Sequence, residues 1–347
     1  MTAQTEIQQR AAVLLEQVAG YVGHRTIQVG LRHGIFERLA GHPDGVTSAD
    51  LAAEAGLDPL YVDVWCRSAF AAGVLDASGS GYRIDPLTAT LLTDRDSPAY
   101  LGGLFPLLTQ PEVFDLFSER LPTGQRTWWD QFGPGFIDGV ASTCRAGYLR
   151  LVPGGLAQVP GLDDVLSGGA DVLDLACGAG FGLQHVARTY PAVRVTGVDG
   201  DPYSVGLAAA ALKEAGLADR TTVWQDTLEA LDRQAEFDAV LVNMSMHECR
   251  DIERVTENVH RALRRGGYFV ISDFPFPEDG AGLRTVPGRI MAGIQFLEAQ
   301  IDDQLLPTRA YVDLLRSHGF ESVDTFEITP THAVTHGRVP CVREATS

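Results

Sequence analysis

The segment DVLDLACGAGFG, residues 171–182, constrains the fold of this chain more than any other feature. It reads as an apolar strand that runs into a glycine-rich turn, and a helical segment, LQHVARTYP, follows it. Glycine is required where the backbone takes a positive φ or comes close to a ligand. From residue 170 onward, short apolar segments alternate with helical segments, a pattern typical of a parallel sheet with helices on both faces. The sequence therefore predicts an α/β fold with a ligand at the glycine-rich turn.

Two kinds of cofactor compete for this turn. The dinucleotide fingerprint requires G-x-G-x-x-G; Gly178 and Gly180 supply the first two glycines, but Leu183 stands in the third place. The strand-end pattern of S-adenosylmethionine (SAM) enzymes is acid-x-G-x-G-x-G. Asp174, Gly178 and Gly180 fit this pattern, with Ala176 in place of the first glycine. The turn therefore favours SAM over NAD.

Polar side chains also follow the next two predicted strands. Asp199 and Gly200 follow VRVTGV, and Gln225, Asp226 and Thr227 follow TTVW. A carboxylate at the end of the second strand can accept hydrogen bonds from both ribose hydroxyls. An acceptor at the end of the third strand can receive the adenine amino group. Because ligands bind beyond the carboxyl ends of parallel strands, these residues and the acid of the first strand predict one cofactor crevice.

The remaining strands are expected in the last third of the chain. The fourth runs from Phe237 to Val242, and Asn243 follows it at the cofactor edge. YFVISDF, residues 268–274, predicts the fifth strand. FESVDTFEIT and AVTHGRV predict an antiparallel pair that closes the sheet. Together these segments predict a Rossmann-like sheet of seven strands.

The first hundred residues have a different character. They read as helical, and the region from about residue 47 to residue 85 has the order helix, turn, helix, small hairpin, which is a winged-helix pattern. The candidate recognition helix, Pro59 to Leu75, carries Asp63 and only one cation, Arg67, and the formal net charge of the chain is −18. Binding to phosphates requires a basic surface. This composition excludes nucleic acid and anionic membranes as expected partners and favours a structural or dimerising role.

Three regions follow from these patterns. Residues 1–100 are expected to form a winged-helix-like dimerisation domain. Residues 101–165, rich in proline, glycine and aromatic residues, are expected to form helices that link the two halves and contribute to a substrate pocket. Residues 166–347 are expected to form the SAM-binding domain.

Five segments in order along the chain resemble the motifs of class I SAM-dependent methyltransferases: DVLDLACGAG, VTGVDGDP, WQD, FDAVLVNMSMHECRD and LRRGGYFVISD. The N-terminal half resembles the dimerising domain of the plant-type small-molecule O-methyltransferases and their bacterial natural-product relatives. The resemblance covers nearly the whole chain. It implies SAM as methyl donor, a small-molecule acceptor methylated most simply at oxygen, and a homodimer.

His247 is the candidate catalytic residue. The segment MHECRD resembles the family segment that carries a base, and on that resemblance His247 takes the acceptor's proton during attack on the methyl group. Asp273 matches the acid that orients this base. Leu306 stands near the place of the family's second acid, so C- and N-methylation stay open beside O-methylation. The structural alternative is a histidine that caps the next helix or bonds its backbone.

A metal site is a further alternative. Some relatives bind iron and methylate the carbon of 2-oxo acids, with the histidine of this loop as a ligand. On that resemblance His247 would be joined by Glu298 or Gln295 from the helical segment RIMAGIQFLEAQ, a ligand set that suits iron. The first expectation is a site without metal.

Large side chains, apolar or aromatic except for Gln295, are expected to line an acceptor pocket, with core packing as the alternative for each. The candidates are Trp128, Trp129, Phe132, Met291, Gln295 and Phe296.

Two general properties complete the prediction. The five cysteines are spread along the chain without a C-x-x-C pair, which fits a reducing cytoplasm, and no apolar stretch is long enough to predict a membrane-spanning helix. Two other classes of function stay open: a SAM-binding fold that has lost methyl transfer and serves other chemistry, and a winged-helix DNA-binding regulator, which the acidic composition disfavours.

Overall fold

The computed structural model describes residues 3–79 and 81–341. The chain divides into two compact units, with the boundary between Thr109 and Gln110. Of the predicted linker, residues 101–109 group with the first unit and residues 110–165 with the second. The predicted outer limits of the domains, residues 1 and 347, lie outside the described residues, and the three-part division stays a prediction.

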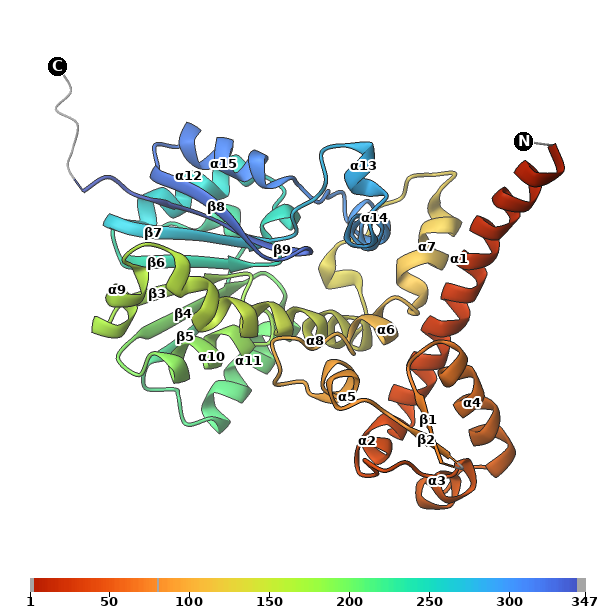
Figure 1. The fold of residues 1–347 in the computed structure, drawn as a ribbon. Coiled ribbons are helices and arrows are strands. Elements are labelled where there is room, and N and C mark those ends of the chain that lie inside the picture. Colours follow the sequence, from red (N-terminus) through yellow and green to blue (C-terminus); the bar gives the residue numbers. More distant parts are fainter. Residues whose placement is uncertain (1–2, 80, 342–347) are drawn as a thin grey trace. The chain divides into compact units, whose positions relative to one another are not determined.

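The first unit is mostly helical and contains one small antiparallel hairpin (Figure 1). Its elements are α1 (Ala3–Arg32), α2 (Ile35–Ala40), α3 (Ser48–Ala55), α4 (Pro59–Ala71), β1 (Asp76–Ser78), β2 (Gly81–Arg83), α5 (Pro86–Thr93) and α6 (Leu104–Leu107).

Side-chain caps explain where α3 and α4 begin. The side chain of Thr47 accepts a hydrogen bond from the backbone N–H of Asp50, and the side chain of Asp58 accepts one from Leu60 with a proline at the first helical position. Such caps satisfy N–H groups that have no partner within the helix. The helix pair packs over a core that includes Leu39, Leu51 and Trp65. The order of elements predicted from the sequence is therefore present.

Helix α1 carries an exposed apolar stripe. Ile7, Leu14, Val18 and Tyr21 are each 60% or more exposed. Their spacing of seven, four and three residues places them on one face of the helix. Exposed side chains of this size on one face are typical of a surface that another protein covers.

The second unit contains the large sheet. Its helices are α7 (Pro111–Arg120), α8 (Pro134–Arg150), α9 (Leu162–Gly168), α10 (Phe181–Thr189), α11 (Pro202–Glu214), α12 (Ile252–Ala262), α13 (Gly280–Leu283), α14 (Val286–Glu298) and α15 (Thr308–Ser317). Its strands are β3 (Asp171–Leu175), β4 (Arg194–Asp199), β5 (Thr221–Gln225), β6 (Phe237–Asn243), β7 (Leu263–Asp273), β8 (Glu321–Thr329) and β9 (His332–Arg338).

The seven strands are arranged in the order β5-β4-β3-β6-β7-β9-β8. Strands β3 to β7 are parallel, and β9 runs antiparallel to both β7 and β8. The predicted α/β fold, the Rossmann-like sheet of seven strands and the closing antiparallel pair are confirmed.

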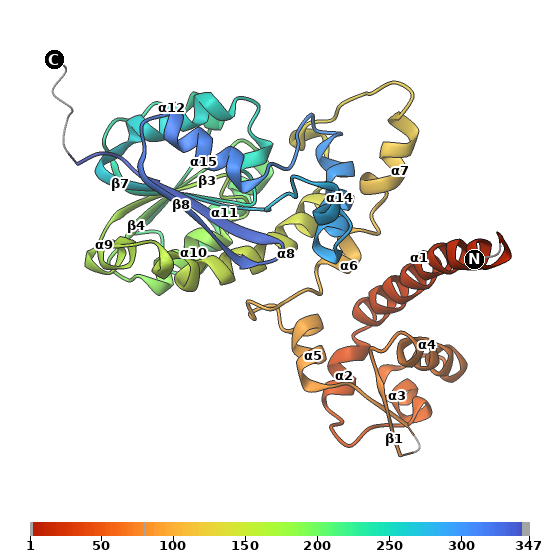
Figure 2. The same cartoon turned by 45° about the horizontal axis from the view of Figure 1, so that its top comes forward.

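Helices cover both faces of this sheet (Figures 1 and 2). Helices α12 and α15 lie on one face, and α10 and α11 lie on the other. Along β3 the side chains alternate: Val172 packs in the core beneath α10, while Leu173 and Leu175 pack in the core beneath α12 and α15. A strand buried on both faces carries apolar side chains toward both, which is why Val172 and Leu173 are apolar at successive positions.

The strand register brings distant residues to one edge of the sheet. Leu175 lies beside Val198 and Val242, Asp199 lies beside Gln225, and the loops that follow these strands therefore start side by side. No helix among the described residues is both long and apolar enough to cross a membrane.

Candidate functional site

A cavity of about 480 Å³ opens at the carboxyl ends of β3 to β6. This volume lies within the range of small-molecule sites. Of the predicted cofactor residues, Gly178, Asp199, Gly200, Thr227 and Asn243 line the cavity. The cavity lining contains neither Asp174, Gly180, Gln225 nor Asp226.

The glycine-rich turn is tied to the end of β4 through Asp199. One carboxylate oxygen of Asp199 accepts the backbone N–H of Gly178 at 2.8 Å, and the other accepts that of Asp201 at 2.9 Å. Gly180 has a φ of 80°, and a Cβ there would lie 2.8 Å from Cβ of Ala208. Burial raises the pKa of Asp199, and the two hydrogen bonds oppose that rise. The turn and the acid thus form one preformed wall of the cavity.

Asp174 lies behind this wall. It is fully buried, and the hydroxyl of Tyr148 in α8 donates to its two oxygens at 2.9 and 3.0 Å. Burial raises the pKa of Asp174 to about 7, while the hydrogen bond from Tyr148 acts in the opposite direction. Tyr148 itself lines the cavity. Tyr148 is not among the residues predicted from the sequence, because its local sequence gives no sign of a contact with Asp174, 26 residues away.

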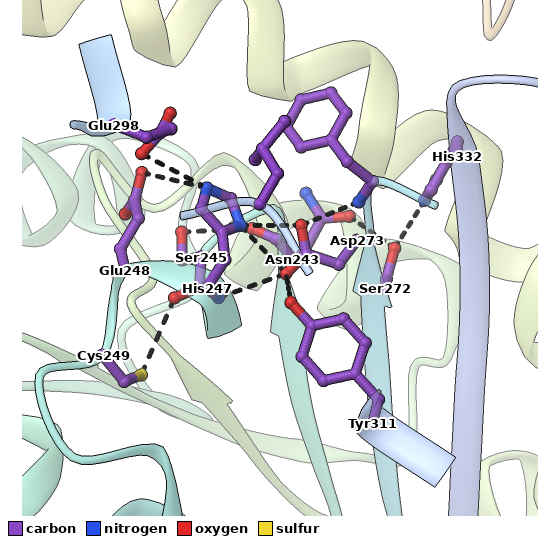
Figure 3. A network of polar contacts seen from close by, with 12 residues as sticks. Asn243, Ser245, His247, Glu248, Cys249, Ser272, Asp273, Glu298, Tyr311 and His332 are labelled. Carbon is purple, nitrogen blue, oxygen red and sulfur yellow. Dashed lines mark hydrogen bonds and ion pairs between the residues drawn. The ribbon is translucent and has the colours of Figure 1, made fainter. Parts of the chain in front are cut away.

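His247 lies in a short 3-10 turn, Met246–Glu248, directly beyond β6. Its Nδ1 is 2.8 Å from one oxygen of Asp273 and 3.0 Å from the other (Figure 3). The hydroxyl of Tyr311 donates to the same carboxylate at 2.8 Å. The structure thus brings together the two residues predicted as base and orienting acid, and it adds Tyr311, which fixes the acid.

The other ring nitrogen of His247 faces two carboxylates. Nε2 lies 3.6 Å from Oε2 of Glu298 and 3.9 Å from Oε1 of Glu248. None of the described residues forms a hydrogen bond with Nε2 or with Oε2 of Glu298, although both atoms are buried. Burial opposes a charge on His247, but the carboxylates of Asp273 and Glu298 outweigh it, so the pKa of His247 lies well above 6.5.

Glu248, and not the imidazole of His247, lines the cavity at this point. Asp303, from the loop after α14, lines it as well. Burial raises the pKa of Glu248 well above its ordinary value, and burial together with Glu298 raises that of Asp303 to about 7. Neither acid is among the residues predicted from the sequence. Asp303 lies three residues before Leu306, so an acid does occur close to the place where the family pattern predicted one.

Three residues of this cluster have the arrangement of a metal site. One ligand atom from each of His247, Glu248 and Glu298 lies within 4.8 Å of the others. Such a set of one imidazole and two carboxylates suits a divalent transition metal. Among the alternatives predicted from the sequence, the structure brings Glu298 to His247, while the side chain of Gln295 turns elsewhere.

The predicted pocket aromatics divide into two groups. Trp128 and Trp129 line the cavity, and the guanidinium of Arg250 lies 3.6 Å from the centre of one Trp128 ring. Phe132 does not line the cavity and packs against Trp129 and Phe136. A flat face next to a cation is suited to an aromatic ligand.

The predicted pocket residues of α14 lie outside the cavity lining. Met291 is 1% exposed and belongs to the core, and Phe296 packs against Phe114 and Phe117. Gln295 donates to the carbonyl oxygen of Asp303 and accepts from the N–H of Leu305. Gln295 therefore supports the loop that carries Asp303.

Residues 172–267 match the methyltransferase domain family. A fatty-acid O-methyltransferase of Mycolicibacterium smegmatis is 30% identical over 128 residues, which is 36% of this chain and 46% of that protein. The chain spans about half the length of the curated relatives it matches, from 46% to 56%.

Solved structures match over nearly the whole chain. The SAM-dependent methyltransferase SibL has a TM-score of 0.70 at 20% identity and covers 94% of this chain and 99% of its own. The mitomycin 7-O-methyltransferase MmcR has a TM-score of 0.70 at 17% identity and covers 97% and 100%. At these identities the shared property is the fold, and it includes the N-terminal helical unit.

Proposed function

We propose that this chain, which contains a methyltransferase domain and has the fold of the class I SAM-dependent methyltransferases, transfers the methyl group of SAM to a small-molecule acceptor, most simply to an oxygen. The observation that carries the proposal is the common edge of the sheet at which the glycine-rich turn with Asp199 and the loop with His247 and Glu248 border one cavity.

We assign binding of the cofactor to the turn after β3 and to Asp199. SAM has a ribose with two hydroxyls, and the carboxylate of Asp199 is already oriented by the N–H groups of Gly178 and Asp201. Thr227 follows β5 and borders the same cavity, where the adenine is expected. Because both walls are formed by regular elements and their first loop residues, binding requires little reorganisation.

The acceptor end rests on the polar cluster beyond β6 and the aromatic wall. An acceptor hydroxyl loses its proton as its oxygen attacks the methyl carbon, and the carbon–sulfur bond breaks to leave the neutral thioether S-adenosylhomocysteine (SAH). Since the donor is activated by its positive sulfur, alignment and proton removal are the tasks of the protein. Trp128 and Trp129 support a flat acceptor.

We assign proton removal to His247 together with Glu248. His247 is held by Asp273 on one side, and its free nitrogen faces the carboxylate that reaches the cavity. The two groups lie close enough to titrate as a pair, so the proton of the acceptor passes to the pair as a unit. The buried Asp273–Tyr311 contact keeps the imidazole in one orientation.

A second candidate function uses a metal. The specific observation is that His247 Nε2 and Glu298 Oε2 are buried without a hydrogen-bond partner among the described residues, and that Glu248 lies beside them. These three residues would hold the ion, and Asp273 would orient the histidine ligand from behind. A bound metal would polarise an acceptor carbonyl as a Lewis acid, which supports C-methylation of a 2-oxo acid as the alternative reaction.

A screen of acceptors with SAM labelled at the methyl group tests both candidates. Phenols, hydroxylated polycyclic compounds, amines and 2-oxo acids are each incubated with the full chain, with and without a chelator. Label transfer to a phenol that resists the chelator supports the first candidate, and chelator-sensitive transfer to a 2-oxo acid supports the second. Binding of SAH without transfer to any class would favour a SAM-binding fold that serves other chemistry.

We further propose a homodimer formed through α1, a winged-helix-like but structural role for α3, α4 and the hairpin, and a cytoplasmic location. The apolar stripe of α1 supports the first. The net charge of −18 supports the second, because a DNA-binding surface needs cations. The five unpaired cysteines support the third, because unpaired thiols are typical of a reducing compartment.

A further inference from the structure

A chain of polar side chains, of which Arg150 is half-buried and the other three are buried, runs from α8 across the sheet to the cavity. Nε of Arg150 donates to Nδ1 of His332 at 3.0 Å, and Nε2 of His332 lies 2.5 Å from the hydroxyl of Ser272. The hydroxyl of Ser272 donates to Oδ1 of Asn243 at 2.9 Å. Figure 3 shows the last three of these residues, which lie on β9, β7 and β6. We call these four residues the Arg150 relay.

The directions of the first two hydrogen bonds in the Arg150 relay follow from Arg150. A guanidinium group has donors and no acceptor, so Nδ1 of His332 must accept. His332 then carries its proton on Nε2, which donates to Ser272. Burial, together with the charge of Arg150, lowers the pKa of His332 to about 3, which agrees with a neutral ring.

The relay ends at Asn243 and fixes the orientation of its side-chain amide. The hydroxyl of Ser272 accepts from Nε2 of His332 and donates its one proton to Oδ1 of Asn243 at 2.9 Å. The two ends of an asparagine amide are distinguished by such a network. The NH₂ group of Asn243 is therefore the part of the amide that the relay does not engage.

That NH₂ group is a buried donor without a partner. Asn243 is 2% exposed, its Nδ2 forms no hydrogen bond with any described residue, and the residue lines the cavity. Gly147 leaves the space for it, because a Cβ there would lie 2.9 Å from Nδ2 and 3.1 Å from Oδ1. A buried N–H without a partner is unfavourable, so the site is built for a ligand that brings an acceptor atom.

The position of Asn243 indicates which ligand supplies the acceptor atom. Asn243 directly follows Val242, which is paired with Leu175 on β3, and the glycine-rich turn starts one residue beyond Leu175. The amide thus lies at the cofactor end of the cavity. SAM and SAH carry a carboxylate on their amino-acid part, which is the strongest acceptor that such a cofactor offers.

We propose that the Arg150 relay orients Asn243 to donate a hydrogen bond to the carboxylate of the bound cofactor, with Ser272, His332 and Arg150 as positioning residues. This inference rests on the proposed function, because it assigns a contact of the cofactor.

Binding of two probes by calorimetry tests the contact. SAH carries the carboxylate, whereas 5′-methylthioadenosine lacks the whole amino-acid part. Asn243→Ala should weaken SAH binding by about 10- to 100-fold, the range for a hydrogen bond to a charged group, and should leave the affinity for 5′-methylthioadenosine unchanged. Equal weakening of both probes would overturn the assignment to the carboxylate and point to the nucleoside or the methyl acceptor instead.

A double-mutant cycle tests the relay. Ser272→Ala should weaken SAH binding by about 3- to 10-fold in the unaltered chain and by less than about twofold in the Asn243→Ala background, because its effect passes through Asn243. Thr335→Val is the matched control, since it removes a buried hydroxyl from β9 that bonds Thr325 and not the relay; it should leave SAH affinity unchanged. Additive effects of Ser272→Ala and Asn243→Ala would overturn the relay.

The tautomer of His332 gives a readout that needs no variant. Nitrogen NMR of the full chain at pH 7 should show a neutral ring with the proton on Nε2. A proton on Nδ1, or a charged ring, would overturn the direction of the relay even if SAH binds. Failure of the unaltered chain to bind SAH would instead overturn the proposed function together with the carboxylate contact, and the tautomer would still decide whether the relay exists.

Discussion

Asp273 holds the Nδ1 side of His247 at 2.8 Å in a site where both side chains are 5% exposed or less. The contact leaves Nε2 as the reactive nitrogen. It also favours the imidazolium form, because Asp273 and Glu298 outweigh the effect of burial and keep the pKa of His247 well above 6.5. The positive charge of His247 in turn keeps the pKa of Asp273 below 3.8 against the effect of burial.

This relationship predicts a pH profile. The folded chain keeps a proton on the His247–Glu248 pair at neutral pH, so proton removal from an acceptor requires the pair to lose it. We expect the rate of methyl transfer at low acceptor concentration to rise as pH increases above 6.5. Asp273→Asn should move this rise to lower pH, because it removes a carboxylate that raises the pKa of His247. A rate that stays flat from pH 6 to pH 9 in both proteins would exclude the pair as the proton acceptor.

Two variants with and without chelator separate base from metal. In the metal-free reaction, His247→Ala should reduce methyl transfer by roughly 10²- to 10⁴-fold, Glu298→Gln should have a much smaller effect, and a chelator should have none. SAH binding should be unchanged in His247→Ala. If Glu298→Gln is as damaging as His247→Ala and the chelator abolishes the reaction, the metal candidate is correct.

Asp199 should contribute directly to cofactor affinity. Asp199→Ala is expected to weaken SAH binding by about 1.5–3 kcal/mol, because it removes a charged acceptor and the anchor of Gly178. Asp219→Ala is the control: Asp219 is exposed, lies before the amino end of β5 and does not line the cavity. Calorimetry that finds the same affinity for both variants would remove Asp199 from the site.

The ionised carboxylate of Asp174 should reduce the free energy of unfolding of the chain without bound cofactor above neutral pH. Its folded-state pKa of about 7 lies above the unfolded value of 3.8, so the folded chain binds the proton more tightly. Stability is then lost as pH rises from about 4 to about 7, at up to about 1.4 kcal/mol per pH unit. Asp174→Asn keeps an acceptor for Tyr148 and removes the charge. Thermal unfolding should show that it stabilises the chain at pH 8 and has little effect at pH 4; destabilisation at pH 8 would contradict this explanation.

The apolar stripe of α1 should form a dimer contact. Leu14→Glu places a charge in the stripe and should shift the chain toward a monomer in light scattering at tens of micromolar. Gln9→Glu adds the same charge on the opposite side of the helix and should leave the dimer intact. A monomeric unaltered chain would show that the stripe has another partner.

The sequence alone determined the helices and strands and the edge of the sheet at which the cofactor is expected to bind. Val172 and Leu173, and the run from Ala239 to Val242, are apolar at successive positions. A half-exposed strand would alternate, so both segments indicate strands inside a covered parallel sheet. The glycine-rich turn and Asp199 could be identified because each directly follows its strand. The pairing of His247 with Asp273 was predicted from the family resemblance, and it forms because the two residues lie at the carboxyl ends of the adjacent strands β6 and β7.

Only the tertiary structure decided what surrounds these residues. Arg150 and His332 are 182 positions apart, and Tyr148 and Asp174 are 26 apart on elements of different type. The direction in which Phe132 or Met291 faces likewise depends on how a whole helix or loop packs. Local sequence encodes strands, caps and turns, because these depend on neighbouring residues. Contacts between side chains of distant elements depend on the packing of the entire unit. The places of Glu248 and Asp303 in the cavity wall and the orientation of Asn243 therefore became visible only in the folded chain.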